Sequence, residues 1–121
     1  MLKDTFFTIL SSACMEKGCI YHVALNGSHP IFQAHFAGNP MMPGAYIVQM
    51  IKELASEYFG RGFFVCAVKN MKFLRAINPS ESSEISVQLV FMQQEDERIS
   101  VGAVLYNGDT VYTKSTLLIY G

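Results

Sequence analysis

Residues 29–53 of this chain hold the side chains whose types and spacing could support chemistry. His35 stands in a segment punctuated by glycine and proline, and such loops commonly carry reactive groups on a rigid scaffold. The pKa of an unperturbed histidine, about 6.5, suits a general base at neutral pH. Gln49 and Glu53 follow as polar residues within an apolar run. What the protein does depends on these three residues, with His35 the candidate for proton transfer.

The histidine segment leads into a predicted helix that spans residues 43–59. Pro43 suits the first turn of a helix because its missing N–H would be unpaired there, and Gly60 can end the helix. Apolar residues cover most of its circumference, so other structure must wrap it. One narrow polar stripe remains, formed at helical spacing by Gln49, Lys52, Glu53 and Ser56.

The rest of the sequence predicts strands that could wrap this helix. Alternating side chains predict strands at 19–26, 63–77, 84–94, 98–106 and 110–120, with a strong hairpin signal at 107–109. Residues 3–16 carry apolar side chains at helical spacing and predict a short amphipathic helix that ends at Gly18. The expected fold is α+β and comprises one domain over residues 1–121. A curved antiparallel sheet of about five strands would surround the long helix, beside a short N-terminal helix.

Composition narrows the classes of function. The chain has 121 residues, of which 50% are hydrophobic and 16% charged, and this low charged fraction suggests that another chain covers part of the surface. A net charge of -1 provides no overall field for nucleic acid or an anionic membrane. No signal pattern appears at the N-terminus, and no run approaches the roughly 20 apolar residues of a membrane helix. Neither a nucleic-acid nor a membrane partner is expected.

The cysteine pattern indicates a reducing compartment. Cys14, Cys19 and Cys66 make an odd number and form no CxxC pair, so we expect free thiols in a cytoplasmic protein. Their spacing is not that of metal ligands, and no metal site is expected.

Residues 29–44, HPIFQAHFAGNPMMPG, resemble the signature of the beta-hydroxyacyl-acyl carrier protein dehydratases of the hot-dog fold. The shared features are a His-Pro-aromatic segment, a His-Phe pair and a Met-Pro-Gly helix start. Residues 68–81, VKNMKFLRAINPSE, are similar to that family's strand before a Pro-Gly-Asp-type turn. The resemblance implies a homodimer, or a larger assembly of dimers, whose two sheets join and whose active sites lie at the interface. It also implies dehydration of a 3-hydroxyacyl chain carried on the phosphopantetheine of acyl carrier protein, without a metal or organic cofactor.

Position by position, the resemblance makes His35 the catalytic base. It makes Gly44 the residue whose backbone N–H holds the thioester carbonyl, and unpaired N–H groups at a helix start do favour developing negative charge. The family's helix acid falls on Gln49, where the pattern breaks. The chain also has Ala37 where the family usually has proline.

Gln49 cannot donate a proton as a carboxylic acid does, and loss of general acid catalysis typically costs about 10²–10⁴ in rate. Glu53 lies one helical turn later on the same stripe, about 6 Å along the axis. One hypothesis is that Glu53 supplies the acid, directly or through a water held by Gln49. The alternative is that Glu53 belongs to the solvated end of the stripe and pairs locally.

Several further residues are candidates for binding. An acyl tunnel would be lined by residues around the helix start, namely Phe36, Met42, Pro43 and Met50. A small basic run of Lys69, Lys72 and Arg75 could meet the acidic carrier protein, although a solvated strand face explains it equally well. His29 and His22 are interpreted as structural.

The leading prediction is a 3-hydroxyacyl-acyl carrier protein dehydratase-like enzyme of fatty acid or polyketide-type biosynthesis. One alternative is an acyl thioesterase of the same fold, which would release a free acid instead of an enoyl product. Another is a non-catalytic acyl-carrier-binding subunit that completes a partner's site in a heterodimer. The glutamine at position 49 keeps this last alternative open.

Overall fold

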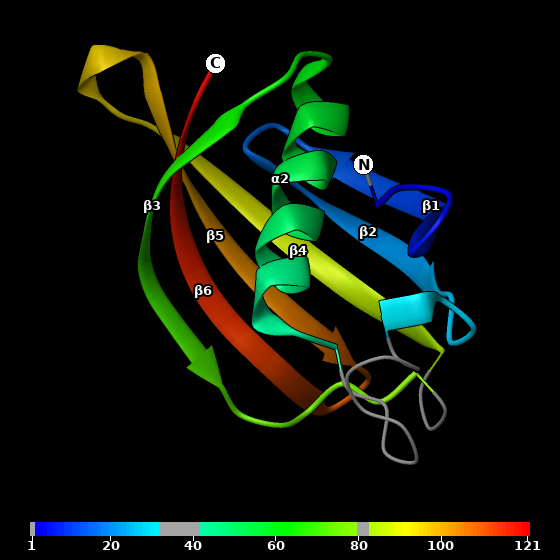
Figure 1. The fold of residues 1–121 in the computed structure, drawn as a ribbon. Coiled ribbons are helices and arrows are strands. Elements are labelled where there is room, and N and C mark those ends of the chain that lie inside the picture. The colour runs from blue at the N-terminus through cyan, green and yellow to red at the C-terminus, as the bar shows by residue number, and fades with distance from the viewer. Residues whose placement is uncertain (1, 32–41, 80–82) are drawn as a thin grey trace.

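The computed structural model describes residues 2–31, 42–79 and 83–121. These residues form a six-stranded antiparallel sheet that curves around one long helix (Figure 1). The strand order is β1-β2-β4-β5-β6-β3. The strands are β1 (Phe7–Met15), β2 (Gly18–Leu25), β3 (Phe64–Phe73), β4 (Glu84–Gln93), β5 (Arg98–Asn107) and β6 (Thr110–Tyr120). The helix is α2 (Gly44–Phe59), and a short 3-10 turn, η1 (Glu95–Glu97), joins β4 to β5.

The core lies between α2 and the concave face of the sheet. One side of the helix buries Ile47, Met50, Ile51, Leu54 and Ala55. Strand alternation places every second side chain of the sheet on that same face. The fully enclosed members include Val87, Leu89, Val101, Leu105, Leu117 and Ile119. The long helix and the strands after residue 60 therefore form close to the predicted bounds, and the helix ends as expected at Gly60, which has a positive φ of 70°.

The prediction of an N-terminal helix over residues 3–16 is wrong, because residues 7–15 form β1. This strand pairs antiparallel with β2 from Phe7 opposite Leu25 to Met15 opposite Gly18. β1 is an edge strand, and most of its side chains are exposed. Because most of its side chains are exposed, β1 lacks the alternation of apolar and polar residues that identifies a half-buried strand. The spacing of its few apolar residues fits either a helix or a strand.

Gly18 begins β2 and does not end a helix. The backbone of β4 approaches so closely that a Cβ at this position would overlap the Leu89 carbonyl oxygen. Glycine is therefore required by the close approach of two strands.

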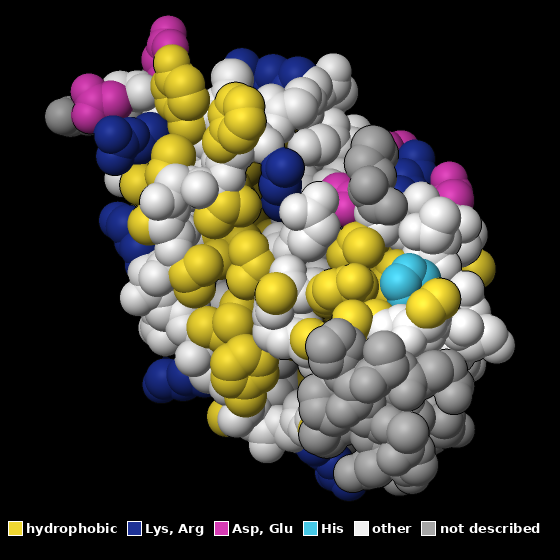
Figure 2. Space-filling view, in the orientation of Figure 1, with side chains coloured by type: hydrophobic (Ala, Val, Ile, Leu, Met, Phe, Trp, Pro, Cys, Tyr) yellow, Lys and Arg dark blue, Asp and Glu magenta, His cyan; other side chains and the backbone are white. Residues whose placement is uncertain are grey.

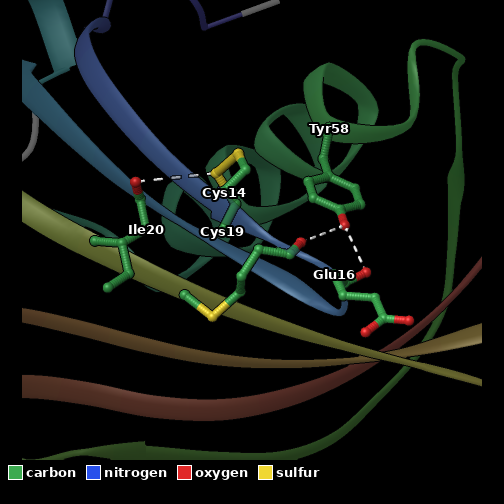
Figure 3. Close-up of a disulfide and its surroundings, with 6 residues drawn as sticks. Cys14, Glu16, Cys19, Ile20 and Tyr58 are labelled. Carbon is green, nitrogen blue, oxygen red and sulfur yellow. Dashed lines mark hydrogen bonds between the residues drawn. A yellow bond between two sulfur atoms is a disulfide. The ribbon is translucent and has the colours of Figure 1, made fainter.

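Cys14 and Cys19 form a disulfide that links β1 to β2, so the prediction of free thiols is wrong for this pair (Figure 3). The two residues face each other across the strands, with Cα atoms 3.9 Å apart. Cys66 is a free, exposed thiol. The Tyr58 hydroxyl lies 3.0 Å from the Met15 carbonyl oxygen and 3.1 Å from that of Glu16. This contact ties the hairpin turn to the end of α2.

Within residues 2–31, 42–79 and 83–121, no helix has the length and apolar character needed to cross a membrane.

Candidate functional site

The start of α2 presents backbone donors that have no hydrogen-bond partner in the described part of the chain. Pro43 precedes the helix in an extended conformation, no side chain of residues 2–31, 42–79 or 83–121 caps the helix, and its first turn contains no acid. The Tyr46 and Ile47 amides donate to the Pro43 carbonyl oxygen at 3.0 and 3.1 Å. The amides of Gly44 and Ala45 precede this ladder and lie at the positive end of the helix dipole. These two N–H groups suit a carbonyl oxygen that gains negative charge.

Residues from two other segments surround this helix start. Phe73 of β3 is 61% exposed, and its ring lies so close to Gly44 that a Cβ there would be 3.1 Å from the Phe73 Cζ. The buried Met42 donates its amide to the Ile77 carbonyl oxygen at 2.8 Å, which fixes the chain just before the helix. Gly44 thus lies beside Phe73, a residue that sequence reasoning did not single out, and the buried Met42, followed by Pro43, leads directly into Gly44.

Met50 is fully buried among the core side chains of α2. His35 and Phe36 lie outside the described residues. The catalytic role of His35 and the binding roles of Phe36 and Met50 stay predictions.

Glu53 is 7% exposed, and its carboxylate accepts hydrogen bonds from three donors. The Leu2 amide reaches both carboxylate oxygens, at 3.0 and 2.8 Å, and the Lys3 amide reaches Oε1 at 2.9 Å. The Gln49 side chain donates its Nε2 to Glu53 Oε2 at 2.8 Å. Glu53 therefore fastens the N-terminal segment to the middle of α2.

These contacts control the charge of Glu53. Burial alone would raise the pKa of its carboxyl group, but the hydrogen bonds from Leu2, Gln49 and Lys3 together lower the pKa below its ordinary value. Glu53 is consequently ionised at neutral pH and has no proton to donate. The catalytic roles of Gln49 and Glu53 stay predictions, and the burial of Glu53 differs from the alternative of a solvated glutamate.

The structure joins Gln49 to Glu53 but separates both from Gly44. Gln49 lies five residues after Gly44, which is roughly 140° around the helix. A pocket of about 350 Å³ lies beside the polar stripe. It is lined by Lys3, Gln49, Lys52, Glu53, Ser56, Glu57, Arg61, Gly62 and Phe63. Within one described chain, the helix start and the polar stripe are two distinct surfaces.

The two described histidines have structural contacts. His29 Nδ1 accepts from the Ile31 amide at 3.2 Å, and the His29 ring packs edge-on against Phe6. His22 Nδ1 lies 2.7 Å from the Ser86 hydroxyl on the neighbouring strand. Among the described residues, no three His, Cys, Asp or Glu side chains gather in a way that could hold a metal ion.

The curved antiparallel sheet around one long helix is the hot-dog fold. Residues 11–105 match the model of the ApeI-like family, described as ApeI dehydratase, and the chain belongs to this family. The resemblance stated from the sequence is thereby confirmed.

Similar curated sequences include two dehydratases. A 3-hydroxyacyl-[acyl-carrier-protein] dehydratase FabZ of Latilactobacillus sakei is 33% identical over 86 residues, which cover 65% of this chain and 59% of that protein. The FabZ of Lactiplantibacillus plantarum is 28% identical over 105 residues, covering 81% of this chain and 70% of the relative. The match with the first of these relatives thus spans less than two thirds of its length.

Solved structures share the hot-dog fold. The dehydratase heterocomplex ApeI:P of Xenorhabdus doucetiae superposes with a TM-score of 0.69 at 14% identity, covering 94% of this chain and 97% of that one. A mutant thioesterase of Pseudomonas aeruginosa gives a TM-score of 0.63 at 15% identity, covering 88% and 76%. The predicted architecture of a helix inside a curved antiparallel sheet is confirmed, with six strands in place of about five.

Proposed function

We propose that this protein eliminates water from a 3-hydroxyacyl chain held as a thioester on acyl carrier protein. The observation that carries the proposal is the pair of amides at Gly44 and Ala45, which have no hydrogen-bond partner among the described residues, in a scaffold that belongs to the ApeI-like dehydratase family. The thioester carbonyl oxygen accepts a hydrogen bond from the Gly44 N–H. This hydrogen bond stabilises the negative charge that develops when the proton on the carbon beside the carbonyl is removed. His35 takes that proton, the double bond forms, and the hydroxyl group leaves the third carbon as water after it has received a proton.

When this chain acts alone, the step without a clear donor is the protonation of the departing hydroxyl group. Gln49 directs its Nε2 donor at Glu53, so its Oε1 acceptor is left for other contacts. An acceptor can orient a water molecule or a hydroxyl group but cannot protonate it. We therefore assign Gln49 an orienting role and Glu53 the role of holding the Gln49 amide.

This arrangement favours a second function. The chain could bind the acyl-thioester and complete the site of a partner subunit that carries a carboxylic acid at the helix position. Its similarity to the fold of a dehydratase heterocomplex is consistent with a two-chain assembly.

Assembly through β3 is part of both proposals. In the described sheet β3 is an edge strand that pairs only with β6, which leaves its other edge open to a second chain. Phe64 and Val68 on this strand are 73% and 47% exposed. Figure 2 shows a band of hydrophobic side chains on the side of the molecule where β3 runs. Continuation of the sheet across this edge would bury the band in a dimer.

Acyl carrier protein is the proposed carrier of the substrate. Lys72 of β3 and Lys114 of β6 lie directly opposite each other and are both exposed. Like charges in this position repel each other, and an acidic partner would relieve the repulsion. Together with Lys69 and Arg75, they form the proposed docking surface. A cytoplasmic location, where this carrier would be met, belongs to the same proposal and can be checked by cell fractionation.

The deciding experiment incubates the purified protein with 3-hydroxyacyl-acyl carrier protein and separates the products by mass spectrometry. Enoyl product from the protein alone supports the first function, and enoyl product only with an acid-bearing partner supports the second. Free acid supports a thioesterase, and no product under any condition overturns both dehydratase proposals. His35→Ala should abolish turnover, whereas the matched control His22→Ala should retain it.

The docking surface has its own test. Lys72→Glu with Lys114→Glu should raise the KM for a substrate on acyl carrier protein. The KM for the same acyl group on free pantetheine should stay unchanged, and an equal rise for both substrates would refute docking at these lysines.

A further inference from the structure

Two hydroxyl groups on β6 are buried without any hydrogen-bond partner in the described part of the chain. They are Thr113 Oγ1 and Ser115 Oγ, on residues that are 0% and 6% exposed. Buried polar side chains almost always have a partner, since the loss of hydration is otherwise uncompensated. Valine and alanine would fill the same space without this cost. The two hydroxyls therefore indicate a group that binds here from outside the described structure.

Strand alternation places both hydroxyls on the concave face of the sheet. Leu117 and Ile119 follow them at every second position and belong to the enclosed core, whereas Lys114 between them is exposed. Thr113 and Ser115 lie two residues apart, roughly 7 Å along the strand. They form a small polar patch on a face of the sheet that is otherwise apolar.

Through Phe73, this polar patch adjoins the start of α2. Thr113 pairs with Phe73 of the neighbouring strand, and Ser115 pairs with Met71. The Phe73 ring in turn lies against Gly44, whose amide is the proposed donor to the thioester. A chain held at Gly44 and entering between α2 and the sheet would pass Phe73 and then meet the two hydroxyls.

We propose that Thr113 and Ser115 form a polar subsite for the acyl chain. The acyl groups that this protein prefers carry a hydrogen-bonding oxygen, as a hydroxyl or keto group, further along than the third carbon. This inference rests on the proposed function and narrows its substrate class from acyl chains in general to oxygenated ones. A purely aliphatic chain would leave both hydroxyls unpaired, and sites built to bond a polar group discriminate strongly against ligands that lack it.

The test measures binding without turnover. Two acyl-pantetheine analogues with an amide in place of the thioester are titrated into the protein by calorimetry. One carries an aliphatic chain, and the other carries a chain of equal length with a keto or hydroxyl group beyond the third carbon. The natural protein should bind the oxygenated analogue at least about tenfold more tightly, the ratio that corresponds to one well-formed hydrogen bond.

Thr113→Val and Ser115→Ala remove the hydroxyls with little change of shape. Each should weaken binding of the oxygenated analogue by about tenfold and leave the aliphatic analogue within about twofold. Each should also raise the Tm of the unliganded protein, because an unpaired buried hydroxyl has been removed. Thr113→Ser should retain the preference, and the matched control Thr116→Val on the other face of β6 should change neither readout.

Three results would overturn the proposal. The first is equal affinity of the natural protein for both analogues, and the second is an equal loss for both in Thr113→Val. The second result would show that the hydroxyls contact a part of the ligand that both analogues share. The third is a fall in Tm without any change in preference, which would show that the hydroxyls bind an internal water. Failure of the dehydratase proposal would look different. The protein would still bind the oxygenated analogue more tightly, but it would form no enoyl product from a substrate with either kind of acyl chain.

Discussion

Replacing Glu53 by glutamine should destabilise the protein and leave its chemistry nearly unchanged. The carboxylate accepts from the Leu2 amide, the Lys3 amide and the Gln49 side chain, and it is almost fully buried. Each donor loses about 1 kcal/mol when its acceptor changes from charged to neutral, and relief from burying the charge offsets part of the total. We expect a loss of about 1–2 kcal/mol in the free energy of unfolding at pH 7.

The pH dependence of this loss follows from the lowered pKa of Glu53 in the folded protein. A carboxyl group with a depressed folded pKa contributes its full stabilisation above its unfolded pKa and loses it as the pH falls through the folded pKa. The stability difference between the natural protein and Glu53→Gln should therefore be largest near neutral pH. It should shrink on acidification below the ordinary range for glutamate.

Urea unfolding at a series of pH values measures this difference. The matched control is Glu57→Gln, on the same helix one turn later, where the carboxylate forms an exposed ion pair with Lys3 at 3.2 Å. Exposed pairs of this kind contribute about 0–1 kcal/mol, and added salt should remove the effect. A difference for Glu53→Gln that is absent, or that stays constant with pH, would refute the anchoring role.

Activity provides the other half of the experiment. If Glu53 only anchors residues 2 and 3 and orients Gln49, folded Glu53→Gln should turn over within a few-fold of the natural protein. A fall of about 10²–10⁴ in kcat, with stability little affected, would instead restore Glu53 as the general acid.

Three further substitutions test the scaffold, each by denaturant unfolding. Gly18→Ala should cost about 1–3 kcal/mol because its Cβ would overlap the Leu89 carbonyl oxygen, and an unchanged midpoint would contradict that close approach. Gly60→Ala should cost about 1 kcal/mol since the helix ends there with a positive φ of 70°; Gly62→Ala, nearby in open space, is the control. Tyr58→Phe should cost about 0.5–1.5 kcal/mol by removing the hydroxyl contact with the turn after β1, and a neutral result would show that water replaces it.

The sequence predicted those elements that carry a local signal. The helix at 44–59 has an apolar circumference with proline before it and glycine after it, and the later strands alternate clearly because one face of each is buried. β1 lacked such a signal, since its identity depends on pairing with β2 and most of its side chains face solvent. The Cys14–Cys19 disulfide was missed for the same reason, because only a hairpin turn at residues 16 and 17 brings the two residues opposite each other.

Within the candidate site, the sequence located the helix start but not the environment of the polar stripe. Gln49 and Glu53 were correctly placed on one stripe, and their contact followed from helical spacing. The burial of Glu53 could not be predicted, because its main partners are backbone amides about fifty residues away, whose presence no side-chain pattern reports. Likewise, the sequence offers no reason to select Phe73 or the hydroxyls of Thr113 and Ser115. They become neighbours only through the register of β3 and β6, which pairs residues about forty positions apart.

The position of β3 has a consequence for how the protein is made. β3 leaves the ribosome directly after α2, yet the only described strand with which it pairs is β6, whose residues are synthesised about forty positions later. In a nascent chain that ends after β5, β3 cannot yet join the sheet, because its neighbour β6 has not been made. The exposed apolar edge proposed for assembly can therefore take its final form only after β6 has emerged, which delays pairing between chains until each subunit has its complete sheet.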